Sequence, residues 1–185
     1  MNDTQEDMRD ALKRVAVVLK RSEIPFALTG GYAVWARGGP EPDHDVDFLV
    51  ASQDVEHAAA ALADEGLHVE RPPEDWLFKV YSGTAMVDVI HRHSGAPAER
   101  GTVQDADLLE VLSVEMPVLS ATELLVQKML AMDEHYCDFG RLIPVARALR
   151  EQVDWDRVRR ETVESHFAAA LVFLLERLDV VPPSS

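Results

Sequence analysis

Apolar positions follow two different spacings along the chain, and the pattern changes near Ser120. In the first two-thirds, a helical spacing of apolar and alanine residues predicts helices over residues 8–21, 32–37 and 53–65. Shorter β-prone runs predict strands at 24–29, 46–50, 67–70, 77–81, 85–92 and 117–119. The stretch 95–104 is rich in small residues and predicts a loop.

The last third of the chain predicts helices only. Ser120 and Glu123 form a capping-box pattern, which opens a helix that extends to Met132. Further helices are predicted at 141–152, 155–163 and 166–178. A mixed first part followed by helices indicates an α+β fold with a mixed sheet flanked by helices. We expect a core over residues 1–119 and a helical C-terminal subdomain over residues 120–185.

Two aspartates beside a predicted strand are the main sign of chemistry. Asp45 and Asp47 are two residues apart, a spacing that directs both carboxylates to one face of a strand ending at Val50. Adjacent acids on one face repel each other unless a positive charge lies between them. We expect Mg²⁺ there, because it prefers oxygen ligands and usually binds one or two carboxylates together with water and substrate phosphates.

Asp88 is the third candidate ligand. It lies in the apolar middle of the run 85–92, where burying an unpaired charge is costly. A turn at 82–84 predicts that this run forms a hairpin with 77–81. If the strand of Asp88 lies beside that of Asp47, the three carboxylates can hold two Mg²⁺ ions. Such ions lie about 3.5–4 Å apart in enzymes that transfer phosphoryl or nucleotidyl groups.

Gly30 and Gly31 stand between a predicted strand and a predicted helix. Glycines allow a ligand to approach the backbone closely, and a helix N-terminus favours anions, so this pair can bind phosphates. A tight turn without a ligand has the same pattern. The three aspartates elsewhere in the chain favour the phosphate interpretation.

The order and spacing of these motifs resemble those of the nucleotidyltransferase superfamily with the polymerase-β-like fold. The segments that carry the resemblance are TGGYAV at 29–34, DVDFLV at 45–50 and VDVI at 87–90. Within the superfamily the chain is most similar to small bacterial members, the aminoglycoside adenylyltransferase-like and AbiEii-toxin-like groups. Arg37 stands earlier than the usual arginine of these groups, and Asp43 occupies the place of their threonine or serine.

The resemblance implies a Mg²⁺-dependent enzyme that transfers a nucleoside monophosphate from a nucleoside triphosphate, such as ATP, to a hydroxyl or phosphate acceptor. It assigns the catalytic and metal-binding roles to Asp45, Asp47 and Asp88. It assigns nucleotide binding to Gly30, Gly31 and Lys128, although Lys128 also fits an ordinary surface lysine. The acceptor is either a small molecule such as an aminoglycoside or the 3′ end of tRNA. The alternative is a noncatalytic nucleotide-binding or antitoxin-like module of the same fold.

Composition narrows the range of partners. The net charge of −15 disfavours nonspecific binding to DNA or RNA and is compatible with a cationic substrate, or with solubility alone. No apolar run is long enough to span a membrane, and no signal peptide is evident. A single cysteine, Cys137, fits a reducing compartment. We therefore expect a cytoplasmic protein.

Several residues keep more than one interpretation. Lys79 can face either the cleft or solvent, depending on the alternation of its strand. His44 adjoins Asp45 and can support a ligand or simply be solvated. The spacing of His91 and His93 fits a zinc pair, but no third nitrogen or sulfur ligand is evident. The apolar run 166–178 can close the core or contact a partner.

Overall fold

The computed structural model describes residues 3–42, 45–93 and 95–182 of the chain. It divides into two compact units. The first comprises Met1–Ala36 and Glu41–Leu119, and the second comprises Arg37–Pro40 and Ser120–Ser185. Within the described residues, no helix is both long and apolar enough to cross a membrane.

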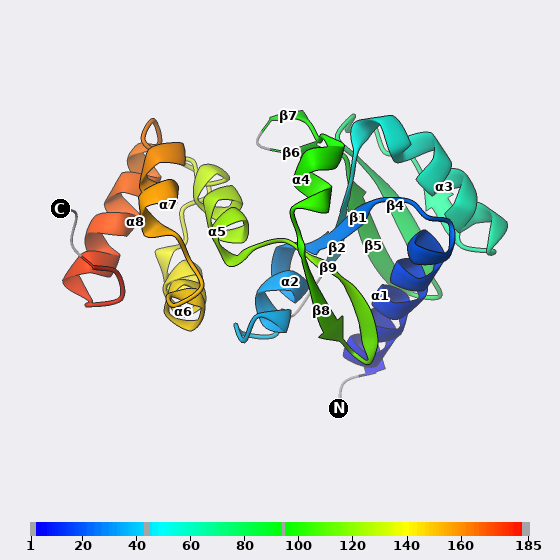
Figure 1. Ribbon diagram of the computed structural model, residues 1–185, viewed down its shortest axis with the longest axis horizontal. Coiled ribbons are helices and arrows are strands. Elements are labelled where there is room, and N and C mark those ends of the chain that lie inside the picture. Colours follow the sequence, from blue (N-terminus) through cyan, green and yellow to red (C-terminus); the bar gives the residue numbers. More distant parts are fainter. Residues whose placement is uncertain (1–2, 43–44, 94, 183–185) are drawn as a thin grey trace. The chain divides into compact units, whose positions relative to one another are not determined.

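The first unit is built on a seven-stranded mixed sheet with the order β3-β4-β5-β2-β1-β9-β8 (Figure 1). Its strands are β1 (Phe26–Thr29), β2 (Val46–Val50), β3 (His68–Glu70), β4 (Leu77–Ser82), β5 (Ala85–Ile90), β8 (Asp107–Val111) and β9 (Val114–Val118). β2 runs parallel to β5, and β1 runs parallel to β9, while the other neighbours are antiparallel. A separate two-stranded ribbon joins β6 (Arg92–His93) to β7 (Ala96–Pro97).

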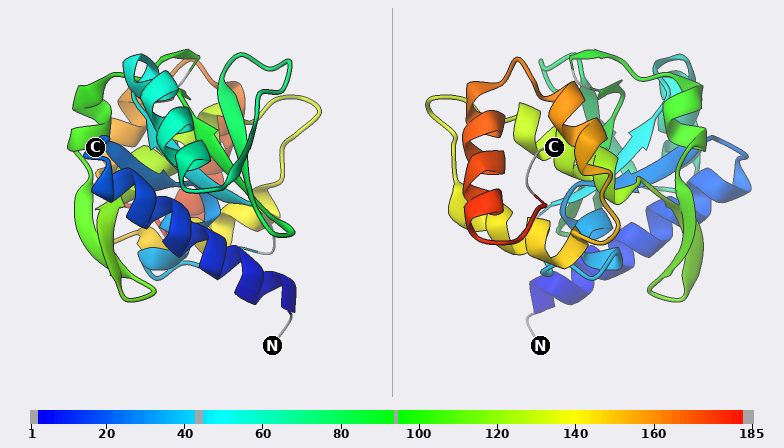
Figure 2. Two further views of the ribbon diagram at one scale, coloured as in Figure 1. Left: turned by 90° about the vertical axis from the view of Figure 1, so that its right-hand side faces the viewer. Right: turned by 60° about the vertical axis from the view of Figure 1, so that its left-hand side comes forward.

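Helices cover the sheet and connect its strands. They are α1 (Asp3–Arg21), α2 (Gly30–Ala36), the short 3₁₀ turn η1 (Ser52–Asp54), α3 (Val55–Asp64) and α4 (Arg100–Gln104). α1 contacts α3, β4, β5 and β9, and Figure 2 shows α1 and α3 in front of the same sheet face. α2 follows β1 directly, so the two glycines predicted to precede this helix instead form its first turn.

The two faces of the central strands differ in polarity. Val46 and Phe48 of β2 pair with Val87 and Val89 of β5, and these four side chains are fully buried. Of the residues that alternate with them, Leu49 is buried, whereas Asp47, Met86, Asp88 and Ile90 are only partly buried. Because side chains alternate between faces, the strands bury one apolar face and leave a second face that is more open and carries the acids.

One prediction about the first unit was wrong and another was incomplete. The stretch 95–104 was expected to be a loop, but it contains β7 and the short helix α4. The strand expected near 117–119 is β9, but the sequence did not predict β8, with which β9 forms a hairpin. Leu112 and Ser113 make the turn of that hairpin with positive φ angles of 52° and 65°, a conformation that usually requires asparagine or glycine.

α4 is connected to the start of α3 by a buried carboxylate. Asp54 is 5 % exposed, and it accepts hydrogen bonds from Nε of Arg100 at 2.8 Å and from a terminal nitrogen of the same guanidinium. The hydrogen bonds from Arg100 hold the pKa of Asp54 below its ordinary value of 3.8, despite the opposing effect of burial. This two-point contact joins segments 46 residues apart in the sequence.

The second unit contains four helices, as the sequence predicted. They are α5 (Ala121–Leu130), α6 (Phe139–Leu149), α7 (Trp155–Glu161) and α8 (His166–Arg177). Apolar side chains from all four form its core, with members that include Leu125, Met129, Ala146, Val158, Leu171 and Leu175. One side of α8 is not covered by the other helices of this unit, and Phe173 on that side is 65 % exposed.

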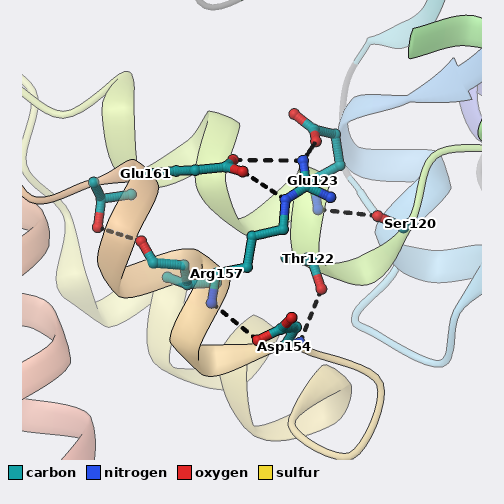
Figure 3. Close-up of polar contacts among 8 residues, drawn as sticks. Ser120, Thr122, Glu123, Asp154, Arg157 and Glu161 are labelled. Carbon is teal, nitrogen blue, oxygen red and sulfur yellow. Dashed lines mark hydrogen bonds and ion pairs between the residues drawn. The ribbon is translucent and has the colours of Figure 1, made fainter. Parts of the chain in front are cut away.

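A polar network joins α5 to α7 inside the second unit (Figure 3). Ser120 caps α5 by accepting a hydrogen bond from the backbone of Glu123, as the capping box predicted. The Glu123 carboxylate, which lies largely buried, accepts a hydrogen bond from Arg157 of α7 at 2.5 Å. Arg157 also pairs with Glu161 one turn later, while Thr122 accepts a hydrogen bond from the backbone N–H of Asp154.

We expect Arg157→Met to lower the free energy of unfolding by about 2 kcal/mol, because it leaves the Glu123 carboxylate buried without its charged donor. Chemical denaturation at pH 7 measures this change. The control is Glu161→Gln, which removes only the more exposed partner of Arg157 and should change stability by less than about 0.5 kcal/mol. Equal effects of the two variants would contradict the assignment.

We also expect Arg100→Met to lower the melting temperature by about 3–6 °C at pH 7. The pKa of Asp54 is lowered by folding, so its contribution is complete above its ordinary pKa of 3.8 and is lost as pH falls through the lower folded value. The difference between variant and wild type should therefore shrink below about pH 4. Arg71→Met, which removes an exposed pair with Glu56, is the control and should show almost no effect.

Candidate functional site

A row of polar residues crosses five neighbouring strands on the more open face of the sheet. Strand register pairs Glu70 with Lys79, Lys79 with Asp88, Asp88 with Asp47, and Asp47 with Thr29. Residues directly opposite each other on adjacent strands point to the same face, and adjacent strands are about 4.8 Å apart. The fold therefore brings Asp47 and Asp88 side by side, although 41 positions separate them in the sequence.

Gly30 packs directly against Asp47. A β-carbon at position 30 would lie 1.9 Å from Oδ2 of Asp47, a distance that no real side chain tolerates. Gly30 also has a φ angle of +64°, which favours glycine. The first glycine of the pair is therefore required at this position, because the Asp47 carboxylate occupies the space that a larger residue would fill.

Gly31 has a different neighbour. A β-carbon there would lie 2.7 Å from Cβ of Pro42, in the segment that leads to Asp45. The same segment is held from the other side, because Arg9 of α1 donates hydrogen bonds from Nε and a terminal nitrogen to Glu41, at 3.0 and 2.5 Å. The Arg9 guanidinium also lies 5.5 Å from the ring centre of Trp35, an arrangement that stabilises its charge. Sequence analysis did not identify this contact, because Arg9 and Glu41 have no pattern in common.

Asp45 lies just before β2 and differs from the expectation for it. The strand begins at Val46, and Asp45 itself has a φ angle of +56°, so strand alternation does not orient its side chain. It is exposed, yet its charge helps to raise the pKa of Asp88. The charge of Asp45 therefore acts on Asp88 although Asp45 precedes the strand and has a left-handed backbone conformation.

Charges around Asp88 act in opposite directions. Burial raises the pKa of its carboxyl group above the ordinary value, and the negative charge of Asp45 adds to the rise. Lys79 opposes both effects, since its Nζ atom lies 3.3 Å from Oδ1 of Asp88. The side chains of Lys79 and Asp88 are only 25 % and 16 % exposed. Lys79 thus faces the acids, which settles the orientation that the sequence left open.

The chemistry of these donors suits a magnesium ion. Within residues 3–42, 45–93 and 95–182, no group of three or more His, Cys, Asp or Glu side chains is gathered closely enough to hold a metal ion. Mg²⁺ does not require such a cage, because it keeps several waters and usually takes one or two carboxylates plus phosphate oxygens. Asp47 and Asp88 fit that requirement, because they are paired in register and offer only oxygen atoms as ligands.

The remaining residues that the sequence singled out belong to other parts of the chain. Lys128 is on α5 in the second unit, and its role in nucleotide binding stays a prediction. His44 lies outside the described residues, and His93 is described only by its backbone in β6. Burial and the neighbouring charge of Arg92 lower the pKa of His91, whose carbonyl accepts a hydrogen bond from Ser52 at 2.6 Å. The backbone of His91 therefore connects the end of β5 to Ser52 of η1.

Known proteins are similar to this chain in sequence pattern and in fold. Residues 2–180 match the model of a protein family described as an uncharacterised nucleotidyltransferase. No curated protein matches the chain. The crystal structure of ANT(2″)-Ia in complex with adenylyl-2″-tobramycin is similar with a TM-score of 0.64 at 14 % identity, over 89 % of this chain and 97 % of that one.

Two further solved structures are similar over most of their length. The lincosamide antibiotic adenylyltransferase LnuA, bound to lincomycin, has a TM-score of 0.51 at 12 % identity, over 72 % of this chain and 91 % of its own. An antigenic nucleotidyltransferase-like protein from Paracoccidioides brasiliensis has a TM-score of 0.52 at 10 % identity, over 95 % and 89 % of the two chains. At these identities the likeness establishes the fold, and it confirms the predicted α+β, polymerase-β-like architecture.

The contact between Gly30 and Asp47 can be tested against a glycine with the same backbone conformation. Gly83 has a φ angle of +63°, but a β-carbon there would meet nothing within 4 Å. Both Gly30→Ala and Gly83→Ala introduce the strain of a left-handed alanine, roughly 1–2 kcal/mol. We expect Gly30→Ala to cost at least a further 2 kcal/mol or so in chemical denaturation, because Asp47 must also move. Equal losses in the two variants would show that the close contact has no energetic consequence.

Proposed function

Because the chain belongs to this family of nucleotidyltransferases, enzymes that transfer nucleotidyl groups, we propose that it transfers a nucleoside monophosphate from a Mg²⁺-bound nucleoside triphosphate to a hydroxyl group of a small molecule. The observation that carries the proposal is the pairing of Asp47 with Asp88 on neighbouring parallel strands, next to the glycine that begins α2. Two carboxylates on one open sheet face beside a glycine backbone suit the binding of a metal–triphosphate complex.

Each residue has a distinct part in the proposed reaction. Asp47 and Asp88 would hold Mg²⁺, and Asp45 would add its negative charge to the attraction. When bound, the ion would offset the negative charge of the triphosphate. The backbone at Gly30 and Gly31 would lie against the phosphates, where side chains would prevent a close approach. Asp88 would also accept the proton of the acceptor hydroxyl. The acceptor oxygen then bonds to the α-phosphorus, and pyrophosphate leaves.

A small-molecule acceptor is favoured over RNA. Two structures of similar fold contain an adenylylated tobramycin and a lincomycin, respectively. The net charge of −15 also disfavours a polyanionic acceptor such as tRNA, and it attracts a cationic one. We therefore place aminoglycosides first among the acceptors to be tested, followed by lincosamides and then tRNA.

The proposal is tested by incubating the protein with each α-labelled nucleoside triphosphate, Mg²⁺ and each acceptor, then measuring transferred label and released pyrophosphate. Asp47→Asn and Asp88→Asn should each lower transfer at least 10³-fold, because each removes a charge that the metal–triphosphate complex requires. EDTA should abolish transfer in the wild type. Asp64→Asn, an aspartate exposed on α3, is the matched control and should leave the rate unchanged.

Two outcomes would contradict the proposal. Wild-type turnover by Asp47→Asn would remove that carboxylate from the reaction. Triphosphate binding without pyrophosphate release, with every acceptor in the panel, would favour the alternative of a noncatalytic nucleotide-binding module.

A further inference from the structure

Lys79 has the geometry of a built-in counter-ion for the acidic site. Its ammonium group lies 3.3 Å from Asp88, and the strand register places Asp88 between Lys79 on one side and Asp47 on the other. Nζ of Lys79 also lies 3.3 Å from Sδ of Met86, two residues before Asp88 on β5. The ammonium is therefore held against β5 by two contacts, and it is not a freely moving surface charge.

The ion pair between Lys79 and Asp88 should weaken the binding of a cation to Asp88. The ammonium group of Lys79 lies 3.3 Å from a carboxylate whose side chain is only 16 % exposed, so solvent screens their interaction less than it would at an exposed surface. A divalent cation bound to Asp88 would lie within a few ångströms of the ammonium, and the two positive charges would repel each other. The ammonium group and the divalent cation would compete for the carboxylate oxygens of Asp88.

We propose that Lys79 is a positioning residue that occupies the cation site in the metal-free protein. It neutralises Asp88 and orients it toward Asp47, and it releases the carboxylate when a divalent ion binds. This inference rests on the proposed function, since it assumes that Asp47 and Asp88 bind a metal. It adds a residue to the site and predicts that lysine and metal compete for Asp88.

The test measures metal binding directly, without turnover. Mn²⁺ is titrated into the purified full-length chain without nucleotide, and the free ion is followed by electron paramagnetic resonance. Lys79→Met keeps the length of the side chain and removes the charge, so we expect Mn²⁺ to bind about tenfold more tightly, equivalent to about 1.4 kcal/mol. Lys79→Arg keeps the charge and should bind Mn²⁺ within about twofold of the wild type.

Thermal unfolding supplies a second readout. In EDTA, Lys79→Met should melt below the wild type, because Asp88 then lies beside Asp47 without the ammonium group of Lys79. Saturating Mg²⁺ should raise its melting temperature more than that of the wild type. A purely structural lysine would lower the melting temperature without tightening metal binding.

The outcomes separate this inference from the function on which it rests. If the wild type binds Mn²⁺ and Asp47→Asn abolishes binding, but Lys79→Met binds no more tightly than the wild type, the role of Lys79 is overturned and the metal site stands. If the wild type does not bind Mn²⁺, or binds it unchanged in Asp47→Asn, the metal site itself is overturned, and the role of Lys79 with it.

Discussion

The parallel pairing of β2 with β5 is the constraint on which the site depends. It matches Val46 with Val87 and Phe48 with Val89, and these buried pairs fix the register because a shift of one residue would turn them toward the open face. Once the apolar pairs are fixed, Asp47 must stand opposite Asp88. The burial of one sheet face therefore positions the acids on the other.

Bringing carboxylates together is unfavourable, and the neighbouring strands moderate the cost. On one side, β4 supplies the ammonium group of Lys79. On the other side, β1 ends at Thr29 and turns directly into α2, where Gly30 leaves room for the Asp47 carboxylate. Asp45, which has a positive φ angle, adds a further negative charge that helps to raise the pKa of Asp88. The fold thus places the ammonium group of Lys79 and the glycine backbone next to the paired acids.

Much of this architecture could be predicted from the sequence, because its signals are local. The run 46–50 was predicted as a strand and is β2, and the Ser120 cap does begin α5. Two elements that the sequence did not predict, α4 and β8, have different causes. α4 is only five residues long and is held by the contact of Arg100 with Asp54, which no local pattern reveals. The β8–β9 hairpin turns at Leu112 and Ser113, residues that rarely adopt positive φ angles.

The side of the sheet to which Lys79 points depends on the length of the turn between β4 and β5. The sequence suggested a turn at 82–84, but Ser82 pairs with Ala85, so only two residues form the loop. The two-residue turn pairs Lys79 with Asp88, whereas a three-residue turn would have placed Val87 opposite Lys79 and directed the ammonium away from the acids. Gly83 permits the tighter turn through its φ angle of +63°. The two-residue turn that contains Gly83 therefore determines that Lys79, and not a neighbouring residue, lies opposite Asp88.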